Sequence, residues 1–338
     1  MLSIMMKYGF SCFLQNEMNL YVEKRKNEVT EATLTKDIIC LSSFDNYINN
    51  NEICEINIES LSNWICSLSN KKNTTINGYI SNMRTFLRYL SALHGKFYYM
   101  PEFKSAEDEY EPYYFTSDNK KEIYDIVDNW IPGRNNKLPW ISIEFPMIIR
   151  ILDGCGTRVN EVLALQTQDI DFQNHVILMR NTKNKKGRRV PIMADLSNVL
   201  SDYCRAMGII SKSQAYLFPR LNRNEHLKVY DIYKKFRNVL IRLGIRHPND
   251  LSRSERGPCL YNLRHTFIID SFRKLNGQGV SLDDTICYLS VYVGHFDLTE
   301  TQRYLKFCTE LFPEDIDRFY GLADEIAGKE DKWDRWEL

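Results

Sequence analysis

Four residues that lie far apart in the sequence have side chains suited to chemistry on a phosphate group. They are Arg158, Arg264, His295 and, nine residues after that histidine, Tyr304. A guanidinium can bind two phosphate oxygens at once, and a phenol can attack phosphorus as a nucleophile. Two arginines, an imidazole and a phenol therefore form a coherent set for phosphoryl transfer, provided that the fold brings them together.

The composition is that of a globular protein with mostly helical structure. The 338 residues leave room for two domains, and 43% hydrophobic and 26% charged residues are ordinary values. Only 15 Gly and 10 Pro occur, which favours helices. The sequence contains no run of 18 apolar residues, so we expect no membrane-spanning helix. Lys7 interrupts the apolar start and no small-residue cleavage site follows, so we expect no signal peptide.

The nine cysteines show neither CxxC nor CxxH spacing. We therefore expect neither a disulfide framework nor a zinc site, and the pattern fits the reducing environment of a cytoplasmic protein. In particular, Cys155 near Arg158 is more typical of a small packing residue than of a nucleophile.

The net charge of zero conceals a segregation of charges along the chain. A protein that binds nucleic acid usually has a basic surface, whereas 44 basic and 44 acidic residues balance here. Residues 180–189 nevertheless hold six basic side chains and no acidic one, and residues 305–338 hold ten acidic and five basic ones. The charge of a DNA-facing surface therefore cannot be taken from the whole-chain value.

Hydrophobic periodicity predicts four helices before about residue 98. The clearest begins at Thr74 or Thr75 and runs to His94, with one apolar face. The acidic segment Met100–Pro112 lacks periodicity and reads as a linker.

Further helices, and one hairpin, are predicted after the linker. The hairpin joins His175–Arg180 to Arg189–Ile192, which are both rich in β-prone residues. The helices are expected at 116–130, Ile143–Asp153, Arg158–Leu165, Leu196–Met207 and Tyr230–Leu243.

The motifs around these residues resemble those of the tyrosine recombinases, or phage integrase family, which cut and rejoin DNA through a phosphotyrosine. Gly154–Leu165 is similar to the family's first arginine motif, with Glu161 at its accompanying acidic position. Residues 61–90 are similar to the third and fourth helices of the family's core-binding domain. Further similar segments, in family order, are 183–192, 261–267 and 293–304.

The resemblance implies a role for each residue of the site. Tyr304 would be the nucleophile and Arg158 and Arg264 the phosphate clamp, with His295 at the start of a helix in support. Lys183, at the hairpin tip eight residues before Pro191, would protonate the leaving 5′-oxygen. A solvated basic turn is the alternative for Lys183, and Lys185 and Lys186 leave the register open.

One position departs from the family pattern. Where the family usually has His-x-x-Arg, this chain has Tyr261 before Arg264. A phenol can hydrogen-bond a phosphate oxygen, but it is not an acid–base group near neutral pH as imidazole is. Either Tyr261 positions the phosphate or the site is weakened. His265 is expected to be a packed, hydrogen-bonded helix residue rather than a catalytic one.

The resemblance also implies contacts with the DNA backbone, for which a solvated polar face is the alternative. The DNA-binding candidates are Lys71, Lys72, Arg84, Arg88, Lys185, Lys186 and Arg188.

The resemblance implies a mainly α protein with a small antiparallel sheet. A helical, SAM-like core-binding domain (1–99) would be joined by a linker (100–114) to an α+β catalytic domain (115–338), without an arm-site-binding domain. The two would clamp double-stranded DNA, and four copies would assemble on two sites. No metal or other cofactor, nor ATP, is expected.

Such an enzyme would belong to a mobile element, act at the nucleoid and have an accessory DNA-bending protein as an optional partner. The alternatives are a type IB topoisomerase-like enzyme that relaxes DNA, and a catalytically weakened DNA-binding protein of the same fold.

The acidic C-terminal segment has apolar residues at helical spacing after Pro313, among them Ile316, Phe319 and Tyr320. These predict an amphipathic tail helix. Burial of its apolar face within the same domain is one alternative. The family resemblance favours the other, docking on a neighbouring subunit.

Overall fold

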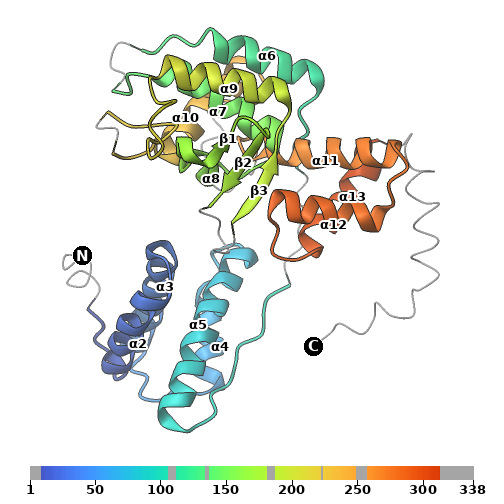
Figure 1. The fold of residues 1–338 in the computed structure, drawn as a ribbon. Helices are drawn as coiled ribbons and strands as arrows, with labels where there is room; N and C mark the ends of the chain where they lie inside the picture. Colours follow the sequence, from blue (N-terminus) through green and yellow to red (C-terminus); the bar gives the residue numbers. More distant parts are fainter. Residues whose placement is uncertain are drawn as a thin grey trace. The chain divides into compact units, whose positions relative to one another are not determined.

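The structure is a computed structural model that describes residues 9–105, 112–133, 137–180, 187–221, 224–248 and 257–312. The chain divides into two compact units, Met1–Glu109 and Tyr110–Leu338, and Figure 1 shows their elements. The division falls within the predicted linker, of which residues 100–105 and 112–114 contain neither helix nor strand. Lys183, Lys185, Lys186 and the predicted tail helix lie outside the described residues.

Unit 1 is a set of helices around one apolar core. Thr30 and Asn57 accept hydrogen bonds from backbone N–H groups in the first turn of the helices that follow them, as N-caps do. Gly95, in the left-handed conformation at φ 62°, ends the last helix. The helices are α2 (Gln15–Glu28), α3 (Glu31–Asn50), α4 (Ile58–Ser67) and α5 (Asn73–His94).

The core of unit 1 follows the apolar periodicity of its longest helix. The periodic side chains of α5 all lie in the core, and Trp64 and Phe44 pack edge to face with ring centroids 5.1 Å apart. The buried α5 side chains are Ile76, Ile80, Met83, Phe86, Leu87 and Leu90. Their burial orients the opposite, polar face of α5 outward.

Unit 2 is mainly helical and surrounds the buried helix α7 (Ile141–Cys155), which packs against its neighbours on several sides. The other helices are α6 (Ser117–Asp128), α8 (Val159–Leu163), α9 (Ala194–Ala206), α10 (Val229–Arg242), α11 (Asn262–Gly277), α12 (Leu282–Val293) and α13 (Thr299–Leu311), with a 3₁₀ turn at Thr167–Asp169. Helices α11, α12 and α13 share a separate small core, and Figure 1 shows them grouped together.

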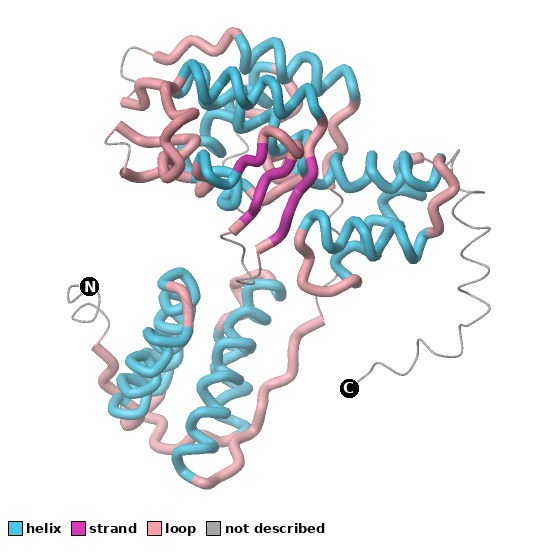
Figure 2. The backbone as a smooth tube through the Cα atoms, viewed as in Figure 1, coloured by secondary structure: helices cyan, strands magenta, loops and turns pink. Residues whose placement is uncertain are grey.

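A three-stranded antiparallel sheet supplies the β structure, and Figure 2 shows its strands in magenta within unit 2. The predicted hairpin forms strands β2 (Val176–Met179) and β3 (Arg188–Pro191), with Ile177 opposite Val190. Both of these side chains are fully buried. The sequence did not indicate the two-residue strand β1 (Ile170–Asp171), which pairs with the outer edge of β2.

A network of charged and phenolic groups fixes α11 to the helices beside it. Lys120 Nζ lies 2.9 Å from Asp153 Oδ1 and 3.1 Å from Asp270 Oδ2. Tyr124 donates to Asp153 and Tyr114 to Asp270, both at 2.6 Å. Because these residues come from α6, α7, α11 and the segment before α6, the network holds α11 against unit 2's core.

No helix among the residues that the structure describes is long and apolar enough to cross a membrane.

Candidate active site

Arg264 is the most deeply buried charged group of the predicted site, with 2% of its surface exposed. Its Nη1 donates to the carbonyl oxygens of Gly156 at 2.8 Å and Val293 at 2.9 Å. Its Nε and Nη2 are buried and make no hydrogen bond to any residue in the described ranges. Buried donors of a charged group are costly to leave unpaired, so these two nitrogens favour an anion as their partner.

The electrostatics of Arg264 lead to the same conclusion. Burial lowers the pKa of this guanidinium, and the nearby charge of Arg158 lowers it further. An arginine nevertheless keeps its proton in proteins. The positive charge of Arg264 is therefore poorly solvated, and an anion such as a phosphodiester would stabilise it.

The turn before α8 can form only because Gly156 has no side chain. Its φ is 57°, and a Cβ there would lie 2.2 Å from the Phe267 ring. This close approach brings the Gly156 carbonyl to Arg264 and places Arg158 at the N-cap of α8, as the sequence predicted. The neighbouring Thr157 hydroxyl is buried and, within the described part of the chain, has no hydrogen-bond partner.

The buried carboxylate of Glu161 accepts hydrogen bonds from two arginines, Arg158 and Arg188. Its oxygens accept from the Arg158 backbone at 3.1 Å and the Arg158 guanidinium at 3.2 Å. Arg188 binds the same carboxylate through both terminal nitrogens, at 3.1 and 2.8 Å. Burial acts to raise the pKa of Glu161, but the hydrogen bonds and charges of Arg188 and Arg158 outweigh it and hold that pKa below its ordinary value.

The expectation that Arg188 contacts DNA needs correction. Its side chain is only 10% exposed, and its Nε donates to the Tyr292 carbonyl at 2.8 Å in addition to the Glu161 ion pair. A Cβ on Gly294 would lie 2.7 Å from its Nη1, so the end of α12 closes over the guanidinium. The Arg188 side chain thus links β3 to α8 and α12 inside the protein, because its nitrogens donate to Glu161 and to the Tyr292 carbonyl.

We expect Glu161→Gln to destabilise the catalytic unit by about 3 kcal/mol at neutral pH, since it leaves a buried arginine without its carboxylate. Because the folded pKa of Glu161 is lowered, its stabilisation is complete above the ordinary value of about 4.3 and disappears as pH falls through the lowered pKa. The difference in unfolding free energy between the two proteins should therefore shrink below about pH 4.

Urea unfolding at several pH values measures this difference. Glu122→Gln, at an exposed position of α6, is the control and should match the parent throughout. An equal stability of Glu161→Gln and the parent at pH 7 would contradict the prediction.

His295 lies beside the clamp, but not at the start of a helix as expected. It follows Gly294, the left-handed C-cap that ends α12 at φ 71°, and precedes α13. Its Nδ1 is 2.6 Å from Thr301 Oγ1, and its side chain is 4% exposed. Burial, together with the positive charges of Arg264 and Arg158, lowers its pKa to about 3, so the imidazole is neutral at pH 7.

Tyr304 lies on α13 within the small core of α11–α13 and is 5% exposed. Its ring stacks on that of His295, with centroids 6.2 Å apart and an interplanar angle of 13°. Its hydroxyl is 2.6 Å from Nδ1 of His265. His265, which we expected to be a packed, hydrogen-bonded helix residue, is hydrogen-bonded as predicted, but the sequence did not indicate that its partner is the predicted nucleophile.

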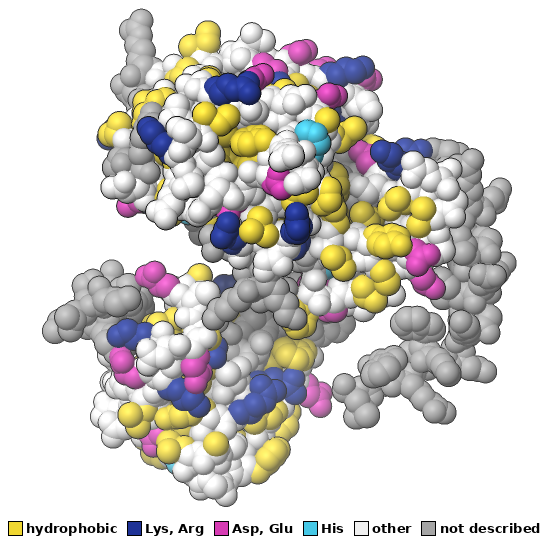
Figure 3. Space-filling model, viewed as in Figure 1, with side chains coloured by type: hydrophobic (Ala, Val, Ile, Leu, Met, Phe, Trp, Pro, Cys, Tyr) yellow, Lys and Arg dark blue, Asp and Glu magenta, His cyan; other side chains and the backbone are white. Residues whose placement is uncertain are grey.

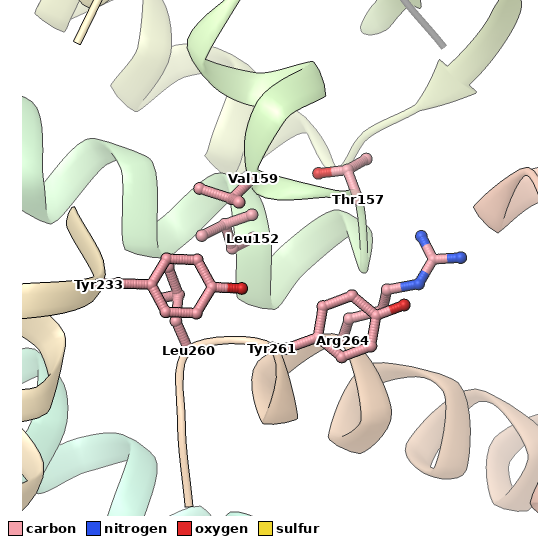
Figure 4. Close-up of a pocket in the computed structure, with 7 residues that line it drawn as sticks. All are labelled: Leu152, Thr157, Val159, Tyr233, Leu260, Tyr261 and Arg264. Atoms are coloured by element: carbon pink, nitrogen blue, oxygen red, sulfur yellow. The ribbon is translucent and has the colours of Figure 1, made fainter. Parts of the chain in front are cut away.

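Tyr261 lies one turn before His265 on the same side of α11 and is 37% exposed. Its ring packs edge to face on that of His265, with centroids 4.9 Å apart. In Figure 4 its hydroxyl points to the same side as the Arg264 guanidinium. The small pocket there is lined by Leu152, Thr157, Val159, Tyr233, Leu260, Tyr261 and Arg264.

The remaining DNA-binding candidates lie on unit 1. Lys72 and Arg88 are exposed, whereas Lys71 and Arg84 are partly buried. The Arg84 guanidinium lies 4.7 Å from the centroid of the Phe103 ring. Figure 3 shows Lys and Arg side chains on the viewed faces of both units, interspersed with Asp and Glu.

Residues 114–309 match the model of the phage integrase family. The putative integrase/recombinase y4rB of Sinorhizobium fredii is 31% identical over 183 residues, 53% of this chain and 56% of that protein. The match thus spans little more than half of that relative. Tyrosine recombinase XerA of Saccharolobus solfataricus is 26% identical over 280 residues, which cover 79% and 78% of the two chains.

Solved structures show the same fold. The XerH site-specific recombinase bound to its difH substrate superposes with a TM-score of 0.65 at 17% identity, over 88% of this chain and 83% of that one. The Tn1549 transposon integrase in complex with circular intermediate DNA gives 0.60 at 17% identity, over 85% and 94%. This chain belongs to the phage integrase family.

Proposed function

We propose that this protein is a tyrosine-type site-specific DNA recombinase that cleaves and rejoins strands through a 3′-phosphotyrosyl intermediate. The observation that carries the proposal is that Tyr304 is hydrogen-bonded to His265, the residue directly after Arg264, and that Arg264 Nε and Nη2 lack a partner within the described residues. Arg158 and Tyr304 both lie close enough to Arg264 to influence the pKa of its guanidinium, which is lowered mainly by burial, so we infer that an anion bound by the arginines lies near the phenol. A phosphodiester provides both the anion and the electrophile.

The proposed reaction assigns one task to each group. Arg158 and Arg264 bind the nonbridging oxygens and neutralise the charge that develops on them. Tyr304 Oη forms a bond to phosphorus as the bond to the 5′-oxygen breaks, and Lys183 protonates that oxygen. His295 and Tyr261 support the clamp through hydrogen bonds. Because one phosphoester replaces another, the exchange needs neither ATP nor a metal.

The same proposal covers the partners. Unit 1 would bind the DNA backbone through Lys71, Lys72, Arg84 and Arg88, and the hairpin through Lys185 and Lys186. The Tn1549 integrase has been solved in complex with circular intermediate DNA and XerH in complex with its difH substrate, which supports double-stranded DNA as the substrate. We extend the proposal in three ways: the protein assembles as a tetramer on two DNA sites, it comes from a mobile element, and it acts at the nucleoid.

Trapping on a suicide substrate tests the function. A nicked duplex that carries the target site loses the short 5′-hydroxyl fragment after cleavage, so the phosphotyrosyl adduct accumulates. We expect an adduct that survives detergent, contains one DNA strand and maps to Tyr304. DNA binding with no adduct would favour the inert binder, and relaxation of supercoils without recombinant products would favour the topoisomerase-like alternative.

A further inference from the structure

A histidine outside the expected catalytic set holds the hydroxyl of the nucleophile. His265 Nδ1 and Tyr304 Oη are 2.6 Å apart, and their ring centroids are 5.5 Å apart. His265 is the residue after Arg264, so α11 positions both the phosphate clamp and this imidazole. The other imidazole in the site, His295, directs its Nδ1 to Thr301 instead.

The surroundings of His265 keep it able to accept a proton. Burial, and then the positive charge of Arg264, lower its pKa to about 4, so the ring is neutral at pH 7. A neutral imidazole carries one nitrogen lone pair, and at Nδ1 that lone pair can accept the hydrogen bond of the phenol. The ionisable groups near it include Tyr261 at the N-cap of α11, Arg264 on α11, Tyr304 on α13 and His295 on the loop before α13.

The spacing along α11 connects this contact with Tyr261. Positions 261 and 265 differ by four residues, and side chains at that spacing lie on the same face of a helix. Tyr261 and His265 are indeed in ring contact. A phenol is a very weak base, whereas the neutral imidazole one turn later, in contact with Tyr304, has a nitrogen that can take up a proton.

We propose that His265 is a catalytic residue that orients Tyr304 and accepts its proton during strand cleavage. As the Oη–P bond forms and the P–O5′ bond breaks, the phenol proton passes to His265 Nδ1, and O5′ receives its proton from the leaving-group acid. In rejoining, the attacking 5′-hydroxyl loses its proton to that acid, and His265 returns a proton to Oη. This inference rests on the proposed function.

Bound DNA removes the electrostatic obstacle to this step. In the free protein the charge of Arg264 disfavours an imidazolium at position 265. The scissile phosphate brings negative charge to the same arginine, and an opposite charge nearby favours the protonated ring. His265 is therefore neutral before the substrate binds and becomes a stronger base when it is bound.

Two substitutions separate proton transfer from packing. His265→Asn places an amide oxygen near the position of Nδ1, so it keeps an acceptor for the phenol but cannot take its proton. His265→Phe keeps an aromatic ring at this position but can accept neither the hydrogen bond nor the proton of the phenol. His226→Asn is the matched control, because that partly buried histidine of unit 2 bonds the Leu227 carbonyl and packs on Tyr216.

Single-turnover cleavage of the nicked substrate is measured for each protein, with half-site binding by gel shift and thermal unfolding measured alongside. We expect His265→Asn to cleave about 10²-fold more slowly, the scale of a lost general base, and His265→Phe at least as slowly. Half-site binding should stay within about twofold, because affinity comes from contacts spread over two units. The His226→Asn control should cleave at the parental rate.

Two readouts distinguish a base from a structural residue. The cleavage rate of His265→Asn should continue to rise with pH to about 9, because solvent must then remove the proton, whereas the parental rate levels off. A substrate whose bridging 5′-oxygen is replaced by sulfur has a leaving group that needs no proton. It should restore cleavage to Lys183→Met, which lacks the leaving-group acid, and not to His265→Asn.

Each result decides the question. Parental cleavage by His265→Asn, a pH profile parallel to that of the parent, or rescue of this variant by the sulfur substrate would overturn the role of His265. In each case a parental adduct at Tyr304 would leave the proposed function standing. If the parent itself forms no adduct, the proposed function fails and this inference fails with it.

Discussion

Tyr304→Phe is expected to abolish DNA cleavage while site binding stays nearly intact. The variant lacks only the oxygen that forms the bond to phosphorus, and a benzene ring can occupy the same place in the small core of α11–α13. Affinity comes mainly from phosphate and groove contacts spread across two units. Detergent-resistant adducts on a nicked substrate report cleavage, and a gel shift reports binding.

The matched control for this prediction is Tyr288→Phe. Tyr288 lies on the neighbouring helix α12 and is 63% exposed, so the loss of its hydroxyl should change neither measurement. A covalent complex formed by Tyr304→Phe would show that another residue is the nucleophile. The other tyrosines would then have to be tested in turn.

Arg264→Lys is expected to slow cleavage by at least about 10²-fold, the scale of one lost transition-state donor. A lysine ammonium cannot bond the Gly156 and Val293 carbonyls and also present two parallel N–H groups to a phosphate. We expect a similar loss for Arg158→Lys, since that guanidinium pairs with Glu161 and lies close enough to Arg264 and His295 to lower their pKa values. Single-turnover rates at saturating DNA measure both effects.

Arg150→Lys controls for the chemical change itself. Arg150 forms a two-bonded ion pair with Asp128, and both bonds are 2.7 Å long. The same substitution there weakens a comparable pair without touching the site, so cleavage should remain at the parental rate. Near-normal cleavage by Arg264→Lys or Arg158→Lys would mean that the phosphate clamp has been assigned to the wrong residues.

The main elements could be predicted because each leaves a local pattern, whereas the site residues were proposed from the family motifs around them. Helix α5 was predicted to within about two residues of its start, since its apolar residues repeat at helical spacing. The β2–β3 hairpin was predicted from β-prone residues on both sides of a polar turn. Arg158 at the start of α8 was predicted from the glycines before it.

Other features depend on contacts between segments that are distant in sequence. Strand β1 is two residues long, too short for periodicity, and forms because β2 offers an edge for pairing. The place of His295 at the end of α12 follows from the left-handed conformation of Gly294, which is packed against Arg188 from β3. A sequence pattern does not specify which side chain will fill that space.

Arg188 and His265 show most clearly what only the tertiary structure decided. The sequence determined that a basic residue begins β3 and that a histidine follows Arg264. The identity of these residues does not decide whether their side chains lie inside the protein or on its surface. Arg188 is an internal group because the fold places the buried Glu161 carboxylate within 2.8 Å of it. His265 meets the nucleophile because α13 packs against α11 across 39 residues of sequence, and hydrogen bonds of that range depend on the packing of helices rather than on any local spacing.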